Sequence, residues 1–348
     1  METKNSSSNR VTIADIARES GVSPATVSLV LRDKPGVSDE TRQRVLDCAQ
    51  ALGYIFVPSV QSQTALSVST IGLVIKVRPD DDPLTNSFYA PVIAGIEAVC
   101  RQYRLNMLYA TMPVDAHNTP LDLPPMLTDQ PPDGLLLVGM QLPQAFLEIL
   151  QRQKLPVVLV DAYAPGDPYD AVITANAEGA YRAVSYLIEQ GHRHIAILGS
   201  QPDAYPSVQE RRQGYLKAIQ EHGLTPYFAD CDLWPDAARP AAEQLLQEHP
   251  HITAVFSCND ETAIAAMQVA RQAGRQVPEE LSVIGFDNIA LAQHVSPPLT
   301  TMRVDKLGMG RLAAQLLVNR IEFPQAGLVR AVIQPELIER DSVCRSTK

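Results

Sequence analysis

The chain has 348 residues, of which 45% are hydrophobic and 20% charged, and its formal net charge is -10. This length predicts more than one domain, and the composition is that of a globular protein rather than a disordered or membrane-spanning one. Residues 1–10 carry no apolar segment of the kind found in secretory signals, so we expect a cytoplasmic protein.

The cysteines and the charge distribution argue against several other kinds of protein. The five cysteines are far apart in the sequence and include no C-x-x-C pair. This spacing argues against a disulfide framework and a zinc site, and we expect neither a metal nor a cofactor. Residues 1–70 hold seven basic and seven acidic residues, leaving 22 basic and 32 acidic residues for the rest of the chain. The first segment is therefore neutral, which does not favour strong non-specific DNA binding.

Three short helices are predicted at the N-terminus. Thr12 and Asp15 have capping-box spacing at the start of the first helix, and Gly21 ends it. Ser23 with Pro24 begins a second helix, and the third runs from Ser38 to about residue 53. The tight turn between the first two helices favours a DNA-binding helix-turn-helix over residues 11–54. A generic three-helix bundle remains the alternative that this pattern leaves open.

An uncharged, serine-rich stretch over residues 57–70 is predicted to be a linker. Beyond it, apolar runs of strand length alternate with amphipathic helical segments. The expected strands are 70–75, 105–110, 134–138, 157–161, 171–174, 195–199, 252–256 and 281–286. The expected helices are 90–103, 143–151, 178–190, 209–221, 240–248 and 261–273. This alternation predicts an α/β fold with parallel sheets and right-handed crossovers. Because one compact unit seldom holds so many strands, we expect two lobes.

Motifs in a fixed order support a family resemblance. They are VTIADIARESGVSPATVS at 11–28, VS at 37–38, LGY at 52–54, GLLL at 134–137, LPVVLVD at 155–161, GHRHIA at 191–196, ND at 259–260, VIGFD at 283–287 and PPLTT at 297–301. Over nearly its whole length the chain resembles the LacI/GalR family of transcriptional regulators. The resemblance implies a homodimer that binds a pseudo-palindromic operator. Since no heptad pattern follows the last predicted strand, we expect dimers rather than tetramers.

The resemblance also implies a division of the chain into three parts. A helix-turn-helix headpiece would occupy residues 1–56 and a hinge residues 57–70. A periplasmic-binding-protein-like domain for an effector and for dimerisation would occupy residues 71–348. Its first lobe would comprise about 71–170 and 299–330, and its second lobe about 171–298 and 331–348.

Family DNA contacts carry over to eleven positions of the headpiece. They are Thr12, Ile13, Ser23, Pro24, Ala25, Thr26, Ser28, Leu29, Ser38, Thr41 and Tyr54. Leu29 stands where many members have an arginine that grips guanine. It therefore predicts an apolar contact, such as one to a thymine methyl. Phe56 replaces a usual proline, and Gln63 replaces the leucine that wedges into the minor groove. A hinge helix from about Pro58 remains open, but its wedging step does not follow from this sequence.

Polar residues follow several predicted strands, where ligands of open α/β sheets bind. Asp287 closes a strand and is favoured as a ligand contact, whereas Asp161 and Asn259 fit a structural role equally well. Asp260 is expected to cap the following helix. The resemblance adds five further effector contacts, namely Phe88, Tyr89, Ser207, Arg211 and Trp234. Aromatic faces beside charged hydrogen-bonding groups suit a sugar, and a nucleoside or purine would also fit.

A transport receptor and an enzyme are the two alternative classes of protein. A sugar-binding transport receptor would share the two lobes, but it would carry a signal peptide and no headpiece. An enzyme is disfavoured because the chain has no G-x-S-x-G, P-loop, G-x-G-x-x-G or H-E-x-x-H motif. We therefore expect a DNA-binding regulator, most simply a repressor, without catalytic residues.

Overall fold

The computed structural model describes residues 11–31, 36–52, 54, 68–78, 83–127, 131–166 and 168–346. The chain divides into two compact units, residues 1–66 and 67–348. Phe56, Pro58 and Gln63 lie outside the described residues, so the expected hinge stays a prediction. No helix in the described part of the chain is both long and apolar enough to cross a membrane.

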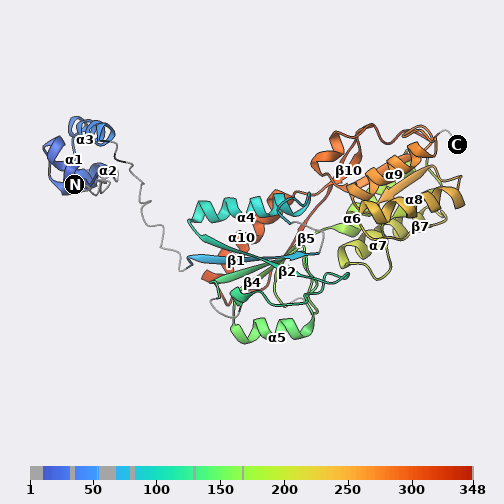
Figure 1. Ribbon diagram of the computed structural model, residues 1–348, viewed down its shortest axis with the longest axis horizontal. Helices are drawn as coiled ribbons and strands as arrows, with labels where there is room; N and C mark the ends of the chain where they lie inside the picture. The colour runs from blue at the N-terminus through green and yellow to red at the C-terminus, as the bar shows by residue number, and fades with distance from the viewer. Residues whose placement is uncertain are drawn as a thin grey trace, which may run out of the picture. The chain divides into compact units, whose positions relative to one another are not determined.

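The first unit contains the three predicted helices, α1 (Ile13–Ser20), α2 (Pro24–Leu31) and α3 (Asp39–Ala51) (Figure 1). The capping box at the start of α1 is confirmed, since the side chains of Thr12 and Asp15 each bond the other's backbone N–H. Gly21 adopts a left-handed φ of 69°, which a glycine reaches without strain and which turns the chain sharply after α1. A small apolar core joins the helices; its buried members are Ile16, Ala17, Val27, Val30, Leu31, Val45 and Ala49.

The first lobe of the second unit is built on a parallel sheet with the order β11-β5-β4-β3-β1-β2. Its strands are β1 (Thr70–Val77), β2 (Asn106–Pro113), β3 (Gly134–Val138), β4 (Val157–Val160), β5 (Asp170–Thr174) and β11 (Arg330–Ile333). Helices α4 (Tyr89–Tyr103) and α10 (Lys306–Glu322) cover one face and α5 (Gln144–Gln153) the other (Figure 1). A short helix η1 (Pro125–Leu127) precedes β3 in the chain. Helices on both faces explain why β3 and β4 are apolar at every position.

Two glycines allow α4 and α10 to pack closely. A Cβ atom at Gly95 would lie 2.2 Å from the carbonyl oxygen of Leu307, and one at Gly310 would lie 2.0 Å from that of Val92. Any larger residue at either position would force the helices apart. The N-terminus of α10 is thereby held against the first lobe, close to the residues that line the cleft described below.

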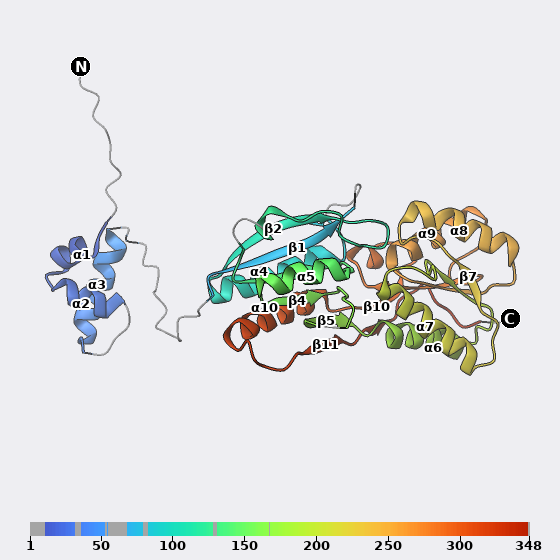
Figure 2. The same ribbon diagram turned by 90° about the horizontal axis from the view of Figure 1, so that it is seen from below.

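The second lobe contains a sheet with the order β12-β10-β9-β8-β6-β7, in which β12 runs antiparallel to β10. Its strands are β6 (Ile195–Leu198), β7 (Tyr227–Ala229), β8 (Ala254–Ser257), β9 (Ser282–Asp287), β10 (Thr300–Arg303) and β12 (Glu336–Ile338). Helices α8 (Pro235–Glu248) and α9 (Asp260–Gln272) cover one face, and α6 (Asn176–Glu189) and α7 (Pro206–Glu221) the other (Figure 2); η2 (Ala290–Gln293) follows β9. The predicted two-lobed α/β fold with parallel sheets is confirmed.

The chain passes between the lobes after β5, after β10 and after β11, which corrects the expected lobe limits. Residues 171–174 were expected in the second lobe but belong to β5 of the first sheet, where Ala171 pairs with Leu159. Residues 300–303 were expected in the first lobe but form β10 of the second sheet, where Met302 pairs with Phe286. Residues 331–333 likewise remain in the first sheet as part of β11. Hydrophobic periodicity indicates that a segment is a strand, but it does not say which sheet the strand joins.

Candidate functional site

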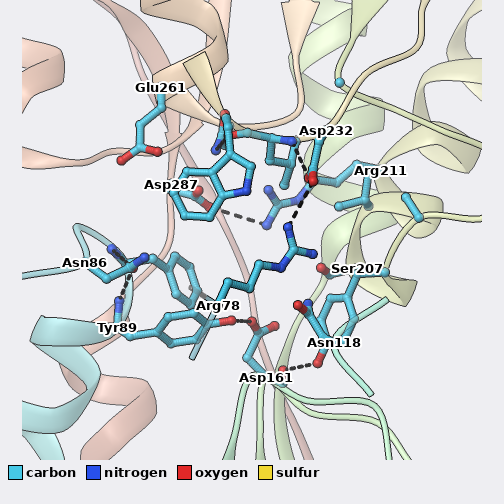
Figure 3. A pocket seen from close by; sticks show the side chains of 18 of the residues that line it. Arg78, Asn86, Tyr89, Asn118, Asp161, Ser207, Arg211, Asp232, Glu261 and Asp287 are labelled. Carbon is cyan, nitrogen blue, oxygen red and sulfur yellow. Dashed lines mark hydrogen bonds and ion pairs between the residues drawn. The ribbon is translucent and has the colours of Figure 1, made fainter. Parts of the chain in front are cut away.

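A cavity of about 180 Å³ lies between the two lobes of the second unit (Figure 3). Its walls come from the carboxyl ends of strands in both sheets, since Arg78 follows β1, Asp161 follows β4 and Asp287 ends β9. This is where open α/β sheets bind ligands. The structure brings all eight predicted effector residues to this cavity: Phe88, Tyr89, Asp161, Ser207, Arg211, Trp234, Asn259 and Asp287. Their roles as ligand contacts remain predictions.

Arg211 and Asp287 form a buried ion pair at the wall of the second lobe. The guanidinium Nη2 lies 3.3 Å from a carboxylate oxygen of Asp287, and the two side chains are only 6% and 10% exposed. Arg211 Nε donates to Asn176 Oδ1 at 2.9 Å, and the guanidinium stacks on the ring of Phe286 with its carbon 3.9 Å from the ring centroid. Figure 3 shows the two charged groups facing one another at the cavity. The surrounding contacts hold the charged groups in one orientation.

Asp161 anchors the opposite wall, in the first lobe. Tyr89 donates its hydroxyl to Asp161 Oδ2 at 3.1 Å. Tyr205, which belongs to the second lobe, donates to the backbone carbonyl of Asp161 at 2.6 Å. Burial raises the pKa of Asp161 to about 6, although Arg211, Lys76 and the Tyr89 hydroxyl act against that shift. The carboxyl therefore holds its proton more readily than an exposed aspartate does, and in its protonated form it can donate as well as accept a hydrogen bond.

Asp260 does not cap α9 as expected. Asn259 is the N-cap, because its Oδ1 accepts the backbone N–H of Thr262 at 2.9 Å. Asp260 is fully buried beside the cavity, where it accepts the N–H of Ile289 and bonds the hydroxyl of Thr301. Burial, with a smaller effect of Asp287, raises its pKa to about 8. The sequence prediction was wrong because Asn259 and Asp260 both lie at the start of α9. Only the backbone conformation, which is extended at Asn259, decides which of the two side chains caps the helix.

Capping limits what Asn259 can offer to a ligand. Its Oδ1 accepts from both the N–H and the hydroxyl of Thr262, and its Nδ2 donates to the carbonyl of Leu233 at 3.1 Å. An amide nitrogen has two hydrogens, so one N–H of Asn259 remains for the cavity. Of the residues predicted from strand ends, Asp161 and Asp287 are therefore better placed for ligand binding than Asn259.

Polar contacts join the two lobes across the cleft. Arg78 of the first lobe pairs with Asp232 of the second at 2.9 Å, and the Ser87 hydroxyl donates to Glu261 at 2.8 Å. Lys306, at the start of α10, donates to the backbone carbonyl of Asp287. The lobes are thus in direct contact at the rim of the cavity.

Sequence reasoning missed several residues that line the cavity, among them Lys76, Arg78, Asn118, Tyr205, Asp232 and Glu261. The rule that ligands bind at the carboxyl ends of strands would have found Lys76 and Arg78, which lie at the end of β1. Nothing in the sequence indicates that the loop carrying Asn118 folds back to the cavity.

In the headpiece, none of the eleven predicted DNA contacts is buried, and they lie on or beside α1, α2 and α3. Leu29 is 39% exposed, whereas Val30 and Leu31 beside it belong to the core. Ser23 accepts the N–H of Thr26 at 3.1 Å and therefore caps α2, as the Ser-Pro pattern predicts. Contacts with DNA at these positions remain predictions.

Comparison with known proteins identifies the architecture. A helix-turn-helix unit followed by two α/β lobes with a cavity between them is the arrangement of a ligand-responsive DNA-binding regulator. Residues 12–56 match the family described as "Bacterial regulatory proteins, lacI family", and residues 184–343 match the "Periplasmic binding protein-like domain".

Relatives of this kind align with the whole chain. The chain is 33% identical to the ribose operon repressor of Haemophilus influenzae, over 95% of this chain and 98% of that protein. It is 32% identical to the transcriptional repressor PurR of Vibrio cholerae, over 97% and 99%. Among solved structures it is similar to a complex of the transcriptional regulator CelR with cellobiose, with 29% identity, a TM-score of 0.69, and coverage of 96% of this chain and 100% of that chain. The chain belongs to the LacI family and is a DNA-binding transcriptional regulator.

Proposed function

We propose that this regulator is a homodimeric repressor whose operator affinity is set by a sugar or sugar derivative bound between the lobes of residues 67–348. The observation that supports it best is the buried Arg211–Asp287 pair in the cavity wall, with the carboxyl of Asp161 on the facing lobe. Adjacent hydroxyls on a sugar ring can accept from a guanidinium and donate to a carboxylate at the same time. The cavity holds and releases this ligand without changing it.

Aromatic residues at the cavity complement these polar groups. Phe88 and Tyr89 pack edge to face with their ring centroids 5.1 Å apart, and Trp234 lines the cavity from the second lobe. Aromatic faces favour the apolar C–H side of a sugar ring, while charged groups bind the hydroxyl edge. Among the relatives, one is a ribose operon repressor and one solved structure contains cellobiose.

A purine or nucleoside is the second candidate ligand. It is favoured by the 32% identity to PurR repressors and by the same aromatic residues, which could stack on a base. The carboxyl groups of Asp161 and Asp287, which line the cavity from the two lobes, favour a ligand rich in donors such as a polyol.

The DNA-binding half of the proposal assigns the recognition of bases to α2. Short residues at its start, Ser23, Pro24 and Ala25, are exposed and would allow a close approach to base edges. One such helix reads only half of an operator, so two copies of the chain are required. Strand β2 lies at the edge of the first sheet and leaves Leu108 and Tyr109 exposed, which supports pairing of two copies there.

A ligand screen on the full chain tests this proposal. Ribose, glucose, cellobiose, adenosine and hypoxanthine are each added during thermal unfolding, since a ligand that binds only the folded state raises the unfolding temperature. We expect one of the sugars to raise it and to change the affinity for operator DNA selected from random sequences. A response to the purine compounds alone would establish the second candidate, and binding of a sugar with no change in operator affinity would contradict the regulatory role.

A further inference from the structure

Two buried polar atoms at the cavity have no hydrogen-bond partner among the described residues. One is the Nε–H of Arg78 and the other is Oδ1 of Asn118, and both residues line the cavity. Asn118 is only 2% exposed. Leaving a buried polar group unpaired is unfavourable, so such atoms are few in native proteins and call for an explanation.

Contacts within the protein fix Arg78 and leave only Nε unpaired. One terminal nitrogen of its guanidinium donates to Asp232 at 2.9 Å and the other to the carbonyl of Ala116 at 2.6 Å. Figure 3 shows the side chain extending through the cavity toward Asp232. The pair with Asp232 also neutralises the charge of Arg78. What Arg78 presents to a ligand is thus a single donor without excess charge.

Hydrogen bonds within the loop also fix the backbone around Asn118. Asp115 Oδ1 accepts the backbone N–H groups of His117 and Thr119 at 2.9 and 2.8 Å. The N–H of Asn118 donates to the carbonyl of Asp115, and Asn118 adopts a left-handed φ of 61°, which asparagine tolerates better than most residues. The backbone of this cavity-lining residue is therefore held in place, and its Oδ1 is a buried acceptor without a partner among the described residues.

One donor and one acceptor at the same wall select the chemistry of their partner. A hydroxyl can pair with each group, because a hydroxyl oxygen can accept from an N–H such as that of Arg78 and its hydrogen can be donated to an amide oxygen such as that of Asn118. A phosphate or carboxylate could accept from Arg78 Nε, but it has no proton for Asn118 Oδ1, and the ion pair with Asp232 leaves Arg78 without a net positive charge to balance an anion. This pair of groups therefore favours a hydroxyl over an anionic group.

We propose that Arg78 and Asn118 form a hydroxyl-binding subsite on the first lobe, which makes the effector a neutral polyol and not a phosphorylated or acidic sugar. This rests on the proposed function and deepens it. The ligand would present hydroxyls to Arg211 and Asp287 of the second lobe and another to Arg78 and Asn118 of the first. It would thereby bridge the two lobes.

Calorimetric titration of the full chain tests the subsite, with ribose, glucose, cellobiose, ribose 5-phosphate and glucose 6-phosphate as probes. The wild-type protein should bind a neutral sugar more tightly than its phosphate. Arg78→Lys keeps the charge but removes Nε–H, and Asn118→Gly removes the acceptor without straining the backbone. Each should weaken binding of that neutral sugar about tenfold. Asn118→Asp retains the acceptor oxygen and should restore most of the affinity lost in Asn118→Gly.

The variant Asp232→Asn tests whether the ion pair between Arg78 and Asp232 sets the preference for a neutral sugar over its phosphate. It leaves Nε of Arg78 in place but frees the guanidinium charge, so the neutral sugar should still bind and the phosphate should bind at least tenfold more tightly than to the wild type. If a sugar binds and requires Arg211 but is insensitive to Arg78→Lys and Asn118→Gly, the subsite is disproved while the proposed function stands. Preference of the wild type for the phosphate would also overturn it. If no sugar binds at all, the proposed function fails and the subsite with it.

Discussion

At the scale of single residues, two of the acidic residues that line the cavity have an unusual backbone conformation. Asp161 and Asp287 have φ values of 46° and 104°, in the left-handed region that residues other than glycine rarely adopt. Such backbone strain costs about 1 to 3 kcal/mol and persists where surrounding contacts enforce it, often at ligand sites. Here the enforcing contacts are the Tyr205 bond to Asp161 and the Arg211 pair with Asp287.

The buried carboxyl of Asp260 should make the stability of the fold depend on pH. Burial raises the pKa of Asp260 in the folded protein from 3.8 to about 8, so its protonated form stabilises the fold and this contribution is lost as pH rises through about 8. Asp260→Asn mimics the protonated carboxyl, since its amide can donate to Thr301 and accept from Ile289. Urea unfolding should show the variant gaining stability relative to the wild type between pH 6 and pH 9. A difference that is constant across this range would contradict the assignment.

At the scale of elements, α2 presents an apolar side chain that the headpiece core does not use. Leu29 is 39% exposed. In the sequence it comes directly after the predicted DNA contacts from Ser23 to Ser28 at the start of α2. Leu29→Arg should change base preference at one position of each half-site, because arginine can pair bidentately with guanine. Such a pair is worth about 1 to 3 kcal/mol of discrimination. Selection from a random operator library checks this, and effector affinity serves as the unaffected control. An identical consensus for both proteins would remove Leu29 from the DNA interface.

The sequence predicts which segments form helices and strands more completely than it predicts which strands pair with one another. Strand β3 and the capping box of α1 follow from local patterns and are found where expected. The sheet to which β10 belongs depends on pairing between distant segments, and no local pattern encodes it. The same holds at the site. Asp287 is visible as a polar end to an apolar strand, whereas Arg211 lies on a helix beside Arg212 and only the family resemblance distinguishes it from a solvated residue. Asn118 depends on the fold of a loop and could not be predicted.

At the scale of the whole molecule, the proposed operator binding requires two copies of the chain. Leu108 on the edge strand β2 is 40% exposed, and burying it against a second copy would be favourable. The wild-type chain should sediment as a dimer at micromolar concentration, and Leu108→Asp should shift it toward monomer and weaken operator binding. The exposed Leu291 in the second lobe, changed to Asp, provides a matched control that should remain dimeric. A wild-type monomer that still binds its operator tightly would be inconsistent with this assembly.

The most direct test of the central claim is an operator titration of Arg211→Ala with and without the sugar found in the ligand screen. Arg211 lies in the second lobe and contacts Asp287 and the cavity, so its loss should not affect the headpiece. Losing a buried charged contact costs about 2 to 5 kcal/mol, enough to move a micromolar ligand to the millimolar range. Lys217→Ala, at an exposed position on the same helix, is the control. We predict that Arg211→Ala binds the operator as the ligand-free wild type does and no longer responds to the sugar, whereas Lys217→Ala responds normally. An undiminished response of Arg211→Ala would contradict the claim that the cavity between the lobes controls DNA binding.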